Sequence, residues 1–330
     1  MTRWMLTGGA GYIGSHVIRR MQAAGHELVL LDDLSTGVAR RIPSDVPLVQ
    51  VNVCDTQAVA QALAEYDVAG VIHFAAKKAV GESVERPLFY YRENVDGILS
   101  LLSAMDQVGV KRLVYSSSAA VYGEPADGLV SEDAPLHPTS PYGETKVVGE
   151  WMVRANARAG ELSGSPMSFV FLRYFNVAGA GGDDLGDTSV ANLIPLVFRA
   201  VTTGQRPKIF GSDYPTPDGT CIRDYIHVMD LADAHVAAVQ RTEELPLGEV
   251  QAAYNVGRGV GSSVREVIDV VGQVIGRDCN PEDVARRPGD PAVLVARADL
   301  IAADLSWKAR YDLTDMVSSA WSAWSAWTNP

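Results

Sequence analysis

The sequence is poor in cysteine, in positive charge and in long apolar runs. Its three cysteines, Cys54, Cys221 and Cys279, are far apart and odd in number. They form neither a metal-binding pair pattern nor a disulfide framework, so we expect a reducing, cytoplasmic environment. The net charge of −12 argues against a nucleic-acid binder, which needs basic stripes. No stretch reaches the roughly 18 apolar residues of a membrane span, and no apolar signal segment opens the chain.

What the sequence does have is a regular alternation of strand-like and helix-like segments over its first half. At 330 residues the chain exceeds the usual size of a single hydrophobic core, so two lobes are expected. Short apolar runs typical of buried parallel strands lie at residues 4–7, 27–32, 48–53, 70–76, 112–118 and 168–175. Helical patterns lie between them, notably at 12–24, 56–65, 91–107 and 142–159. This rhythm predicts an α/β fold with a doubly wound parallel sheet, the Rossmann arrangement.

The rhythm changes after residue 175. The segment 176–190 is rich in glycine and aspartate and reads as a long loop, of the kind that often forms lids or binding loops. We therefore expect one domain over 1–175 and a smaller, discontinuous α/β lobe over 176–330, with the strand and helix of 223–240 returning to the first sheet. Near the end of the chain the sequence WSAWSAW (321–327) places three tryptophans at three-residue spacing. These could form a stripe that binds a partner, but an amphipathic helix whose tryptophans pack on the protein's own core is favoured.

The first strand ends in a glycine-rich turn typical of dinucleotide sites. In TGGAGYIG, Gly8, Gly11 and Gly14 would let backbone N–H groups approach a pyrophosphate at the start of a helix. The next strand ends in Asp32, 18 residues beyond Gly14, near the spacing of a carboxylate that binds the adenosine ribose. A carboxylate there would repel a 2′-phosphate. The pattern therefore predicts NAD rather than NADP.

A serine, a tyrosine and a lysine follow in an order that fits hydride-transfer chemistry. Ser118 ends a predicted strand, where open α/β sheets place ligands, and Tyr142 and Lys146 lie one helical turn apart. A tyrosine with a pKa near 10 is a poor base at neutral pH, but a nearby ammonium favours its phenolate. Tyr142 could then remove an alcohol proton, with Ser118 holding the same oxygen and Lys146 tuning the pair.

Several longer motifs identify a family. TGGAGYIGSH, HFAAKKAVGES, YSSSAAVYG, SPYGETK, LRYFNVAGA and RDYIHVMDLADAH together resemble the UDP-glucose 4-epimerases of the extended short-chain dehydrogenase superfamily, over about residues 3 to 320. The resemblance implies an NAD-dependent isomerase that interconverts UDP-galactose and UDP-glucose through a 4-keto sugar. It also implies a homodimer, formed through the helices near 91–107 and 142–159.

The resemblance carries over to individual positions. Ser118, Tyr142 and Lys146 match catalytic residues. Cofactor contacts are matched by Gly8, Gly11, Tyr12, Ile13, Gly14, Asp32, Asn52, Val53, Phe74, Ala75, Lys78, Asn94, Tyr142, Lys146 and Phe175. Positions that hold the UDP-sugar, besides Ser118 and Tyr142, are matched by Asn176, Asn192, Leu193, Phe210, Arg223, Arg287, Asp290 and Leu294. Arginines suit a diphosphate because charge-assisted contacts are strong.

Three positions depart from the family pattern. Asn52 stands where an aspartate commonly binds the adenine amino group, so NAD affinity could weaken. Lys77 stands where the residue is usually aliphatic. Leu294 lies near a position whose size affects the space beside the sugar C2, which leaves N-acetylated substrates conceivable.

Three alternative functions compete with this interpretation: a dehydratase, an epimerase of another UDP-sugar and a non-catalytic NAD sensor. A nucleotide-sugar dehydratase needs an acid and a base directly after the catalytic serine, and Ala119 and Ala120 cannot move protons. An epimerase of another UDP-sugar, such as an N-acetylated sugar or a pentose, stays open. A non-catalytic NAD sensor is disfavoured because all three catalytic residues are present. The carboxylates of Asp183, Asp184 and Asp187 lack calcium-loop spacing, so no metal is expected.

Overall fold

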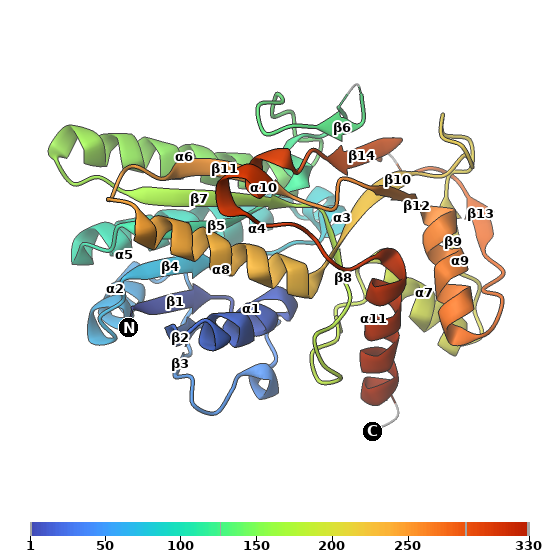
Figure 1. Cartoon of the computed structure of the whole chain (residues 1–330), viewed down its shortest axis with the longest axis horizontal. Coiled ribbons are helices and arrows are strands. Elements are labelled where there is room, and N and C mark those ends of the chain that lie inside the picture. Colours follow the sequence, from blue (N-terminus) through green and yellow to red (C-terminus); the bar gives the residue numbers. More distant parts are fainter. Residues whose placement is uncertain (1, 126, 288, 329–330) are drawn as a thin grey trace. The chain divides into compact units, whose positions relative to one another are not determined.

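The computed structural model describes residues 2–125, 127–287 and 289–328, and its helices and strands are labelled in Figure 1. The chain forms two compact units. Unit 1 contains the residues up to Val121, Pro138–Arg173 and Ala232–Tyr254. Unit 2 contains Tyr122–His137, Tyr174–Leu231 and the residues from Asn255 onward.

Unit 1 is built on a seven-stranded, mostly parallel sheet flanked by helices. The strand order is β11-β7-β5-β4-β1-β2-β3. The strands are β1 (Arg3–Thr7), β2 (Glu27–Leu31), β3 (Leu48–Val49), β4 (Gly70–His73), β5 (Arg112–Ser118), β7 (Ser168–Tyr174) and β11 (Gln251–Val256). Because β2 and β3 extend from one side of β1 and β4 lies on its other side, the order reverses between β1 and β4. The predicted doubly wound α/β fold is confirmed, and this reversal is where such sheets bind ligands.

The helices of unit 1 connect these strands. They are α1 (Tyr12–Ala23), η1 (Ala39–Arg41), α2 (Thr56–Glu65), α3 (Val80–Glu85), α4 (Pro87–Tyr90), η2 (Tyr91–Asp96), α5 (Gly97–Val108), η3 (Ala119–Val121), α6 (Pro141–Ser163) and, from Ala232 onward, α8 (Val228–Glu244). Side chains of α2, α5 and α6 share one core cluster with β1, β2, β4, β5 and β7. Helices α1 and α8 are joined by the Arg20–Asp233 ion pair.

A wide turn interrupts one of these helices. The chain is helical without a break from Pro87 to Val108, but its middle part, η2, is a π-helix. Such turns contain one more residue than an α-helical turn and are frequent at functional sites. Asn94, one of the predicted cofactor residues, lies in this turn and is buried.

Unit 2 contains a five-stranded sheet and a short parallel pair. The larger sheet has the order β12-β10-β14-β6, with β8 also paired to β10, and the pair is β13-β9. Together the two sheets of unit 2 contain β6 (Leu129–Val130), β8 (Asn176–Ala178), β9 (Lys208–Phe210), β10 (Ile222–His227), β12 (Gly261–Ser263), β13 (Glu282–Val284) and β14 (Val293–Ala296). Its remaining helices are α7 (Leu193–Thr202), α9 (Val264–Ile275), α10 (Asp299–Leu305) and α11 (Leu313–Thr328).

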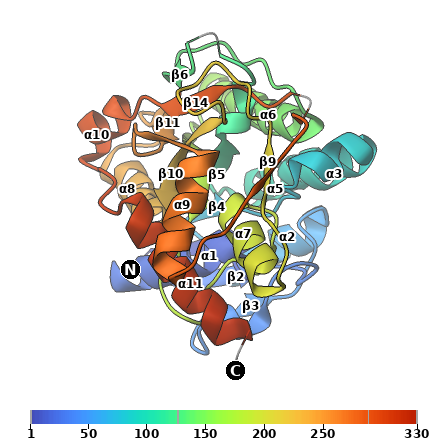
Figure 2. The same cartoon turned by 90° about the vertical axis from the view of Figure 1, so that its right-hand side faces the viewer.

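The repeated tryptophans of the tail lie in α11, which packs against α7 and α9 (Figure 2). Trp321 and Trp324 approach Phe198 with ring centroids 5.2 and 5.9 Å apart. Both are partly buried and pack against the core cluster of unit 2, so the predicted core-packed helix is confirmed for them.

Two boundaries differ from those expected. Strand β10 does not return to the first sheet, because Ile222–His227 pairs with β8, β12 and β14 of unit 2. Only from Ala232 onward does this segment belong to unit 1. Residues 122–137, placed in the first domain on sequence, belong to unit 2, because Leu129 and Val130 pair with Val295 and Ala296 of β14.

Candidate active site

The glycine turn after β1 is tight and lies directly against the turn after β4. Gly8 has φ +71°, and a Cβ on it would lie 2.7 Å from the backbone nitrogen of Ala75. The turns after β1 and β4 therefore touch, at the point where the strand order reverses. Gly11 precedes α1 without any side-chain cap, so the first N–H groups of that helix are not used by a capping side chain. These features fit a dinucleotide.

The side chain of Asp32 closes this turn from the second strand. Its carboxylate accepts hydrogen bonds from the backbone of Ala10 at 2.9 Å and of Leu34 at 2.8 Å. Burial raises the pKa of Asp32, and these two bonds oppose that rise. Each oxygen keeps a further lone pair, so the carboxylate can still accept a ribose hydroxyl.

A clash at Gly8 gives a direct test of this turn. A Gly8→Ala variant is expected to lose NAD affinity by more than about tenfold, because the new Cβ would clash with the Ala75 backbone. In addition, the positive φ at this position costs a residue with a Cβ about 1–2 kcal/mol. Titration calorimetry with NAD measures the loss. Gly25→Ala is the matched control, since Gly25 has φ +88° with nothing within 4 Å of an added Cβ. Equal NAD affinity of the two variants would contradict a role for the Gly8 turn.

The other predicted cofactor positions differ in their surroundings. Asn94 donates to the Lys77 carbonyl and to Thr145 Oγ1 and accepts from the Lys77 N–H, so it ties the turn after β4 to α6. Phe74 lies against His235 with centroids 4.9 Å apart. Val53 belongs to the hydrophobic core of unit 1, and the Lys78 side chain is exposed. Tyr12 is buried and Ile13 partly so in the first turn of α1, Ala75 follows Phe74, and Phe175 lies in unit 2.

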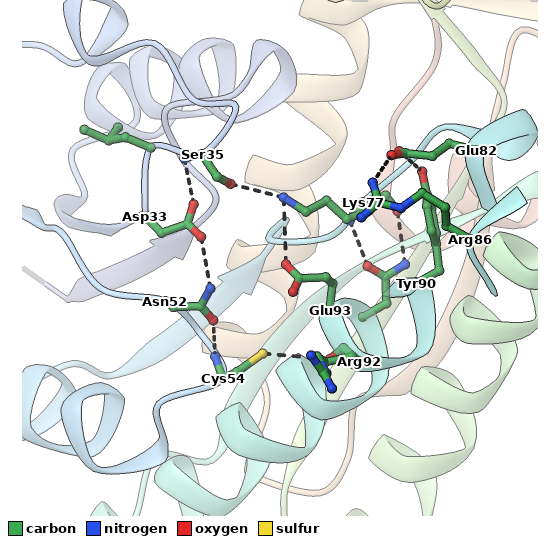
Figure 3. A network of polar contacts seen from close by, with 12 residues as sticks. Asp33, Ser35, Asn52, Cys54, Lys77, Glu82, Arg86, Tyr90, Arg92 and Glu93 are labelled. Atoms are coloured by element: carbon green, nitrogen blue, oxygen red, sulfur yellow. Dashed lines mark hydrogen bonds and ion pairs between the residues drawn. The ribbon is translucent and has the colours of Figure 1, made fainter. Parts of the chain in front are cut away.

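Asn52 also has its polar atoms engaged. Its amide nitrogen donates to Asp33 Oδ2 at 3.0 Å, and its oxygen accepts from the Cys54 N–H at 2.9 Å (Figure 3). The side chain is therefore fixed between the turns after β2 and β3. One lone pair of the oxygen is left for an adenine amino group.

Helix α6 is joined to the end of β5 by three side chains spaced four residues apart. Tyr142 interacts with the Ser118 hydroxyl, and Lys146 Nζ donates to the Ser116 carbonyl at 2.7 Å. One turn further, Glu150 accepts from Ser117 Oγ at 2.7 Å. Close approach of the helix depends on Gly149, where a Cβ would overlap the Tyr115 hydroxyl. The structure thus brings Ser118, Tyr142 and Lys146 together.

Burial shifts the pKa values of both Tyr142 and Lys146. It raises the pKa of the Tyr142 hydroxyl, and the hydrogen bond with Ser118 lowers it. Burial also lowers the pKa of Lys146 to about 8, an effect that the negative charge of Glu150 opposes. The Lys146 ammonium lies 6.0 Å from the centroid of the Tyr142 ring.

The low pKa of Lys146 makes stability depend on pH in a defined direction. Folded protein releases this proton near pH 8, whereas unfolded chain holds it to about 10.5, so the unfolded state binds more protons in this window. The free energy of unfolding of the wild type should therefore rise with pH, relative to Lys146→Met, between these values. Urea titrations of both proteins across the window measure it. If the difference in unfolding free energy between the wild type and Lys146→Met stays constant across this pH window, the pKa of Lys146 in the folded protein is not lowered.

Glu150 and its partner Arg173 were not found from sequence. Arg173 donates to both Glu150 oxygens, at 2.8 and 2.6 Å, and both side chains are almost fully buried. The signal was present, because Glu150 follows Tyr142 and Lys146 at the same four-residue spacing and therefore shares their helix face.

The predicted UDP-sugar positions form two groups within unit 2. Arg223 is the register partner of Leu294 and donates to Asp290 at 3.4 Å. Arg287 lies 3.8 Å from the centroid of the Phe210 ring, a cation–π contact. The first group contains a largely buried guanidinium and the second an exposed one.

The remaining predicted positions flank these groups. Asn192 donates to Asp187 at 2.8 Å and immediately precedes α7, and Leu193 is the first residue of that helix. Asn176 begins β8 and is exposed. Within the described residues there is no cluster of His, Cys, Asp or Glu that could hold a metal ion.

Unit 1 thus combines a tight glycine turn after β1 with Ser118, Tyr142 and Lys146 at the carboxyl end of β5. Comparison with known proteins identifies the family of the chain. The chain belongs to the NAD dependent epimerase/dehydratase family, whose model matches residues 4–257.

Among curated relatives, the chain is similar to the UDP-glucose 4-epimerase of Azospirillum brasilense, with 45% identity over 95% of this chain and 89% of the relative. Among solved structures, it is similar to the UDP-glucose 4-epimerase of Stenotrophomonas maltophila with bound NAD and formylated UDP-arabinopyranose, at 38% identity and a TM-score of 0.93 over 99% of each chain. The Bifidobacterium longum UDP-glucose 4-epimerase in complex with NAD+ and UDP matches at 36% identity, with a TM-score of 0.90 over 100% of this chain and 99% of that one.

Proposed function

We propose that this protein is an NAD-dependent 4-epimerase that interconverts UDP-galactose and UDP-glucose. The observation that carries the proposal is the convergence of Ser118, Tyr142 and Lys146 at the end of β5, in the same sheet whose first strand is followed by the glycine turn. Close similarity to UDP-glucose 4-epimerases over nearly the whole chain supports the substrate.

The three residues divide the chemistry among them. Tyr142 takes the proton of the sugar 4-hydroxyl and later returns it to the 4-keto oxygen. Ser118 holds that oxygen, and Lys146 stabilises the phenolate through its charge. When bound, NAD would supply the hydride acceptor and then the hydride donor for C4 of the sugar, so the reaction would involve no net oxidation. The residues proposed to hold NAD are those of the glycine turn, Asp32 and the turn after β4.

The residues after Ser118 support epimerisation over dehydration. Elimination of water from a sugar needs a further acid and base next to the reacting carbon. Ala119 and Ala120 of η3 occupy the two positions after Ser118, and neither side chain can carry a proton.

In unit 2, Arg223 and Arg287 are proposed to bind the diphosphate, with Asn176, Asn192, Leu193, Phe210, Asp290 and Leu294 completing the UDP-sugar site. Asp290 orients the buried guanidinium of Arg223. Leu294 is adjacent to it across β10 and β14, so its size bears on which sugar fits. An epimerase of another UDP-sugar is the second candidate, favoured by the formylated UDP-arabinopyranose in the Stenotrophomonas relative.

Incubation with UDP-galactose and no added NAD tests the activity. The anomeric protons of the sugars, followed by NMR, should show UDP-glucose rising to a stable ratio. If added NAD is needed, the cofactor is weakly held. If no change occurs even then, the galactose/glucose proposal fails and the same assay is repeated with N-acetylated and pentose UDP-sugars.

We also propose a homodimer formed through α5 and α6. Its support is the exposure of large apolar side chains there, since Leu99 of α5 is 52% and Trp151 of α6 is 60% exposed. Within the described residues, no helix is both long and apolar enough to span a bilayer. All three cysteines are free, and this supports the proposal of a cytoplasmic location.

Charge placed on that helix pair should break the dimer. Trp151→Glu is expected to convert a dimer into a monomer, because a carboxylate buried in an apolar interface is unpaired. Sedimentation velocity measures the mass of each species. Leu300→Glu in α10, where the leucine is 41% exposed, is the control and should stay dimeric. A Trp151→Glu protein that sediments like the wild type would exclude this interface.

A further inference from the structure

Lys77 joins three segments at the carboxyl ends of β2 and β4. Its ammonium donates to Ser35 Oγ at 3.1 Å and lies 3.8 Å from Glu93 Oε2 (Figure 3). Ser35 follows β2, Lys77 follows β4 and Glu93 lies in η2. The Lys77 and Glu93 side chains are only 20% and 22% exposed, so this ion pair is partly shielded from water. We call these two contacts the Lys77 bridge.

A second route connects the same segments. Asp33 accepts from the Ser35 N–H at 2.9 Å and from Asn52 Nδ2 at 3.0 Å. Asn52 in turn accepts from the Cys54 N–H, and Cys54 Sγ lies 3.9 Å from the Arg92 carbonyl of η2 (Figure 3). The turn after β2 is therefore linked to η2 twice, once through Lys77 and once through Asn52. Together the two routes close a ring of polar contacts.

The ring lies next to the carboxylate expected to bind the cofactor ribose. Burial raises the pKa of Asp32, and the positive charge of Lys77 is among the effects that oppose this rise. Burial also acts to raise the pKa of Asp33, but hydrogen bonds from Ser35 and the charge of Lys77 hold it below its usual value, so the ammonium is close enough to act on both carboxylates. Asp32 directly follows β2, where a ribose-binding carboxylate stands in dinucleotide sites. The Lys77 bridge thus lies at the adenosine end of that site.

We propose that Lys77 is a positioning residue for the cofactor, whose bridge from Ser35 to Glu93 holds the segments around the adenosine half of NAD and slows its release. The inference rests on the proposed function, because NAD is the ligand. The Lys77 backbone is fixed separately, since Asn94 bonds both its N–H and its carbonyl. A change of the side chain therefore removes the bridge and leaves the path of the turn in place.

The test follows the release of labelled NAD. Full-length protein is loaded with radiolabelled NAD, freed of excess and diluted into unlabelled NAD, and the bound label is counted over time. Lys77→Met is expected to release NAD about tenfold faster than the wild type, because loss of a partly buried charge pair acts mainly on dissociation. Lys77→Arg, which keeps the charge and the reach, should stay close to the wild type.

Lys111→Met is the matched control for the loss of one lysine. Lys111 precedes β5, at the amino end of the strand, and pairs with Asp106 at 2.8 Å. It should release NAD at the wild-type rate. Melting of the NAD-free proteins is measured alongside, and the Lys77→Met variant should melt within a few degrees of Lys111→Met.

Glu93→Gln separates the bridge from a direct contact between Lys77 and NAD. If the bridge acts, Glu93→Gln also speeds release, and Lys77→Met/Glu93→Gln is no faster than Lys77→Met alone. If Lys77 instead binds the cofactor phosphates, freeing it from Glu93 slows release or leaves it unchanged, which overturns the proposal. Retention of NAD by Lys77→Met at the wild-type rate also overturns it. A wild type that binds no NAD at all refutes the proposed function itself.

Discussion

A Tyr142→Phe protein is expected to lose turnover by about a thousandfold and to keep its NAD. General acid–base catalysis contributes about 10²–10⁴-fold, and the change removes only the hydroxyl that would carry the proton. Tyr142 is only 8% exposed, so its ring should stay packed in place and the fold and the cofactor site should be retained. Turnover is measured by NMR with UDP-galactose, and NAD binding by the label-release assay.

Tyr66→Phe provides the matched control. Tyr66 is the C-cap residue that follows α2, and its carbonyl accepts from the Arg3 side chain near the amino ends of β1 and β4, away from Ser118 and Lys146. It should turn over at the wild-type rate. Ser118→Ala combined with Tyr142→Phe should be little slower than Tyr142→Phe alone, since the two hydroxyls act on one oxygen. Wild-type turnover by Tyr142→Phe would remove that residue from the mechanism.

The second large effect is expected on stability. Arg173→Met should cost about 3–5 kcal/mol of unfolding free energy, because it leaves the Glu150 carboxylate buried without its bidentate partner. Glu150 is 0% and Arg173 3% exposed, so water cannot replace the lost contact. In a protein of this size the melting temperature should fall by about 10 °C, which calorimetry measures.

An exposed ion pair gives the comparison. Arg265 and Asp283 lie 3.2 Å apart with side chains 36% and 50% exposed, and Arg265→Met should cost less than about 1 kcal/mol. Removing both buried charges, as Glu150→Met/Arg173→Met, should be less harmful than Arg173→Met alone, because no unpaired charge remains. Equal costs for Arg173→Met and Arg265→Met would mean that the buried pair is hydrated.

Much of unit 1 could be predicted because its signals are local. The turn at Gly8, Asp32 at the end of β2, and the spacing of Tyr142 and Lys146 each follow from a few neighbouring residues. The structure confirms the doubly wound sheet and places Ser118 beside Tyr142. The alternation of short apolar runs was sufficient, since parallel strands covered by helices are buried on both faces.

What sequence reasoning missed depends on pairings between distant segments. The strand and helix of 223–240 were predicted to return together to the first sheet. From Ala232 onward the helix does belong to unit 1, but β10 pairs with β8, β12 and β14. The direction of the Lys77 side chain could not be predicted either. It depends on Ser35 and Glu93, which lie 42 and 16 positions away in the sequence.

The π-helical turn η2 has a consequence for how this helix can change. One extra residue in a turn rotates the side chains before it by about 100° around the helix axis relative to the side chains after it. Here Tyr90, before the turn, accepts from the Ala79 N–H, whereas Ile98 and Leu101, after it, pack into the core of unit 1. A single-residue deletion in η2 would restore an even spiral. Such a deletion would leave the core contacts of Ile98 and Leu101 in place but turn Tyr90 away from Ala79. The single extra residue of η2 therefore lets the two halves of this helix present different faces to the protein.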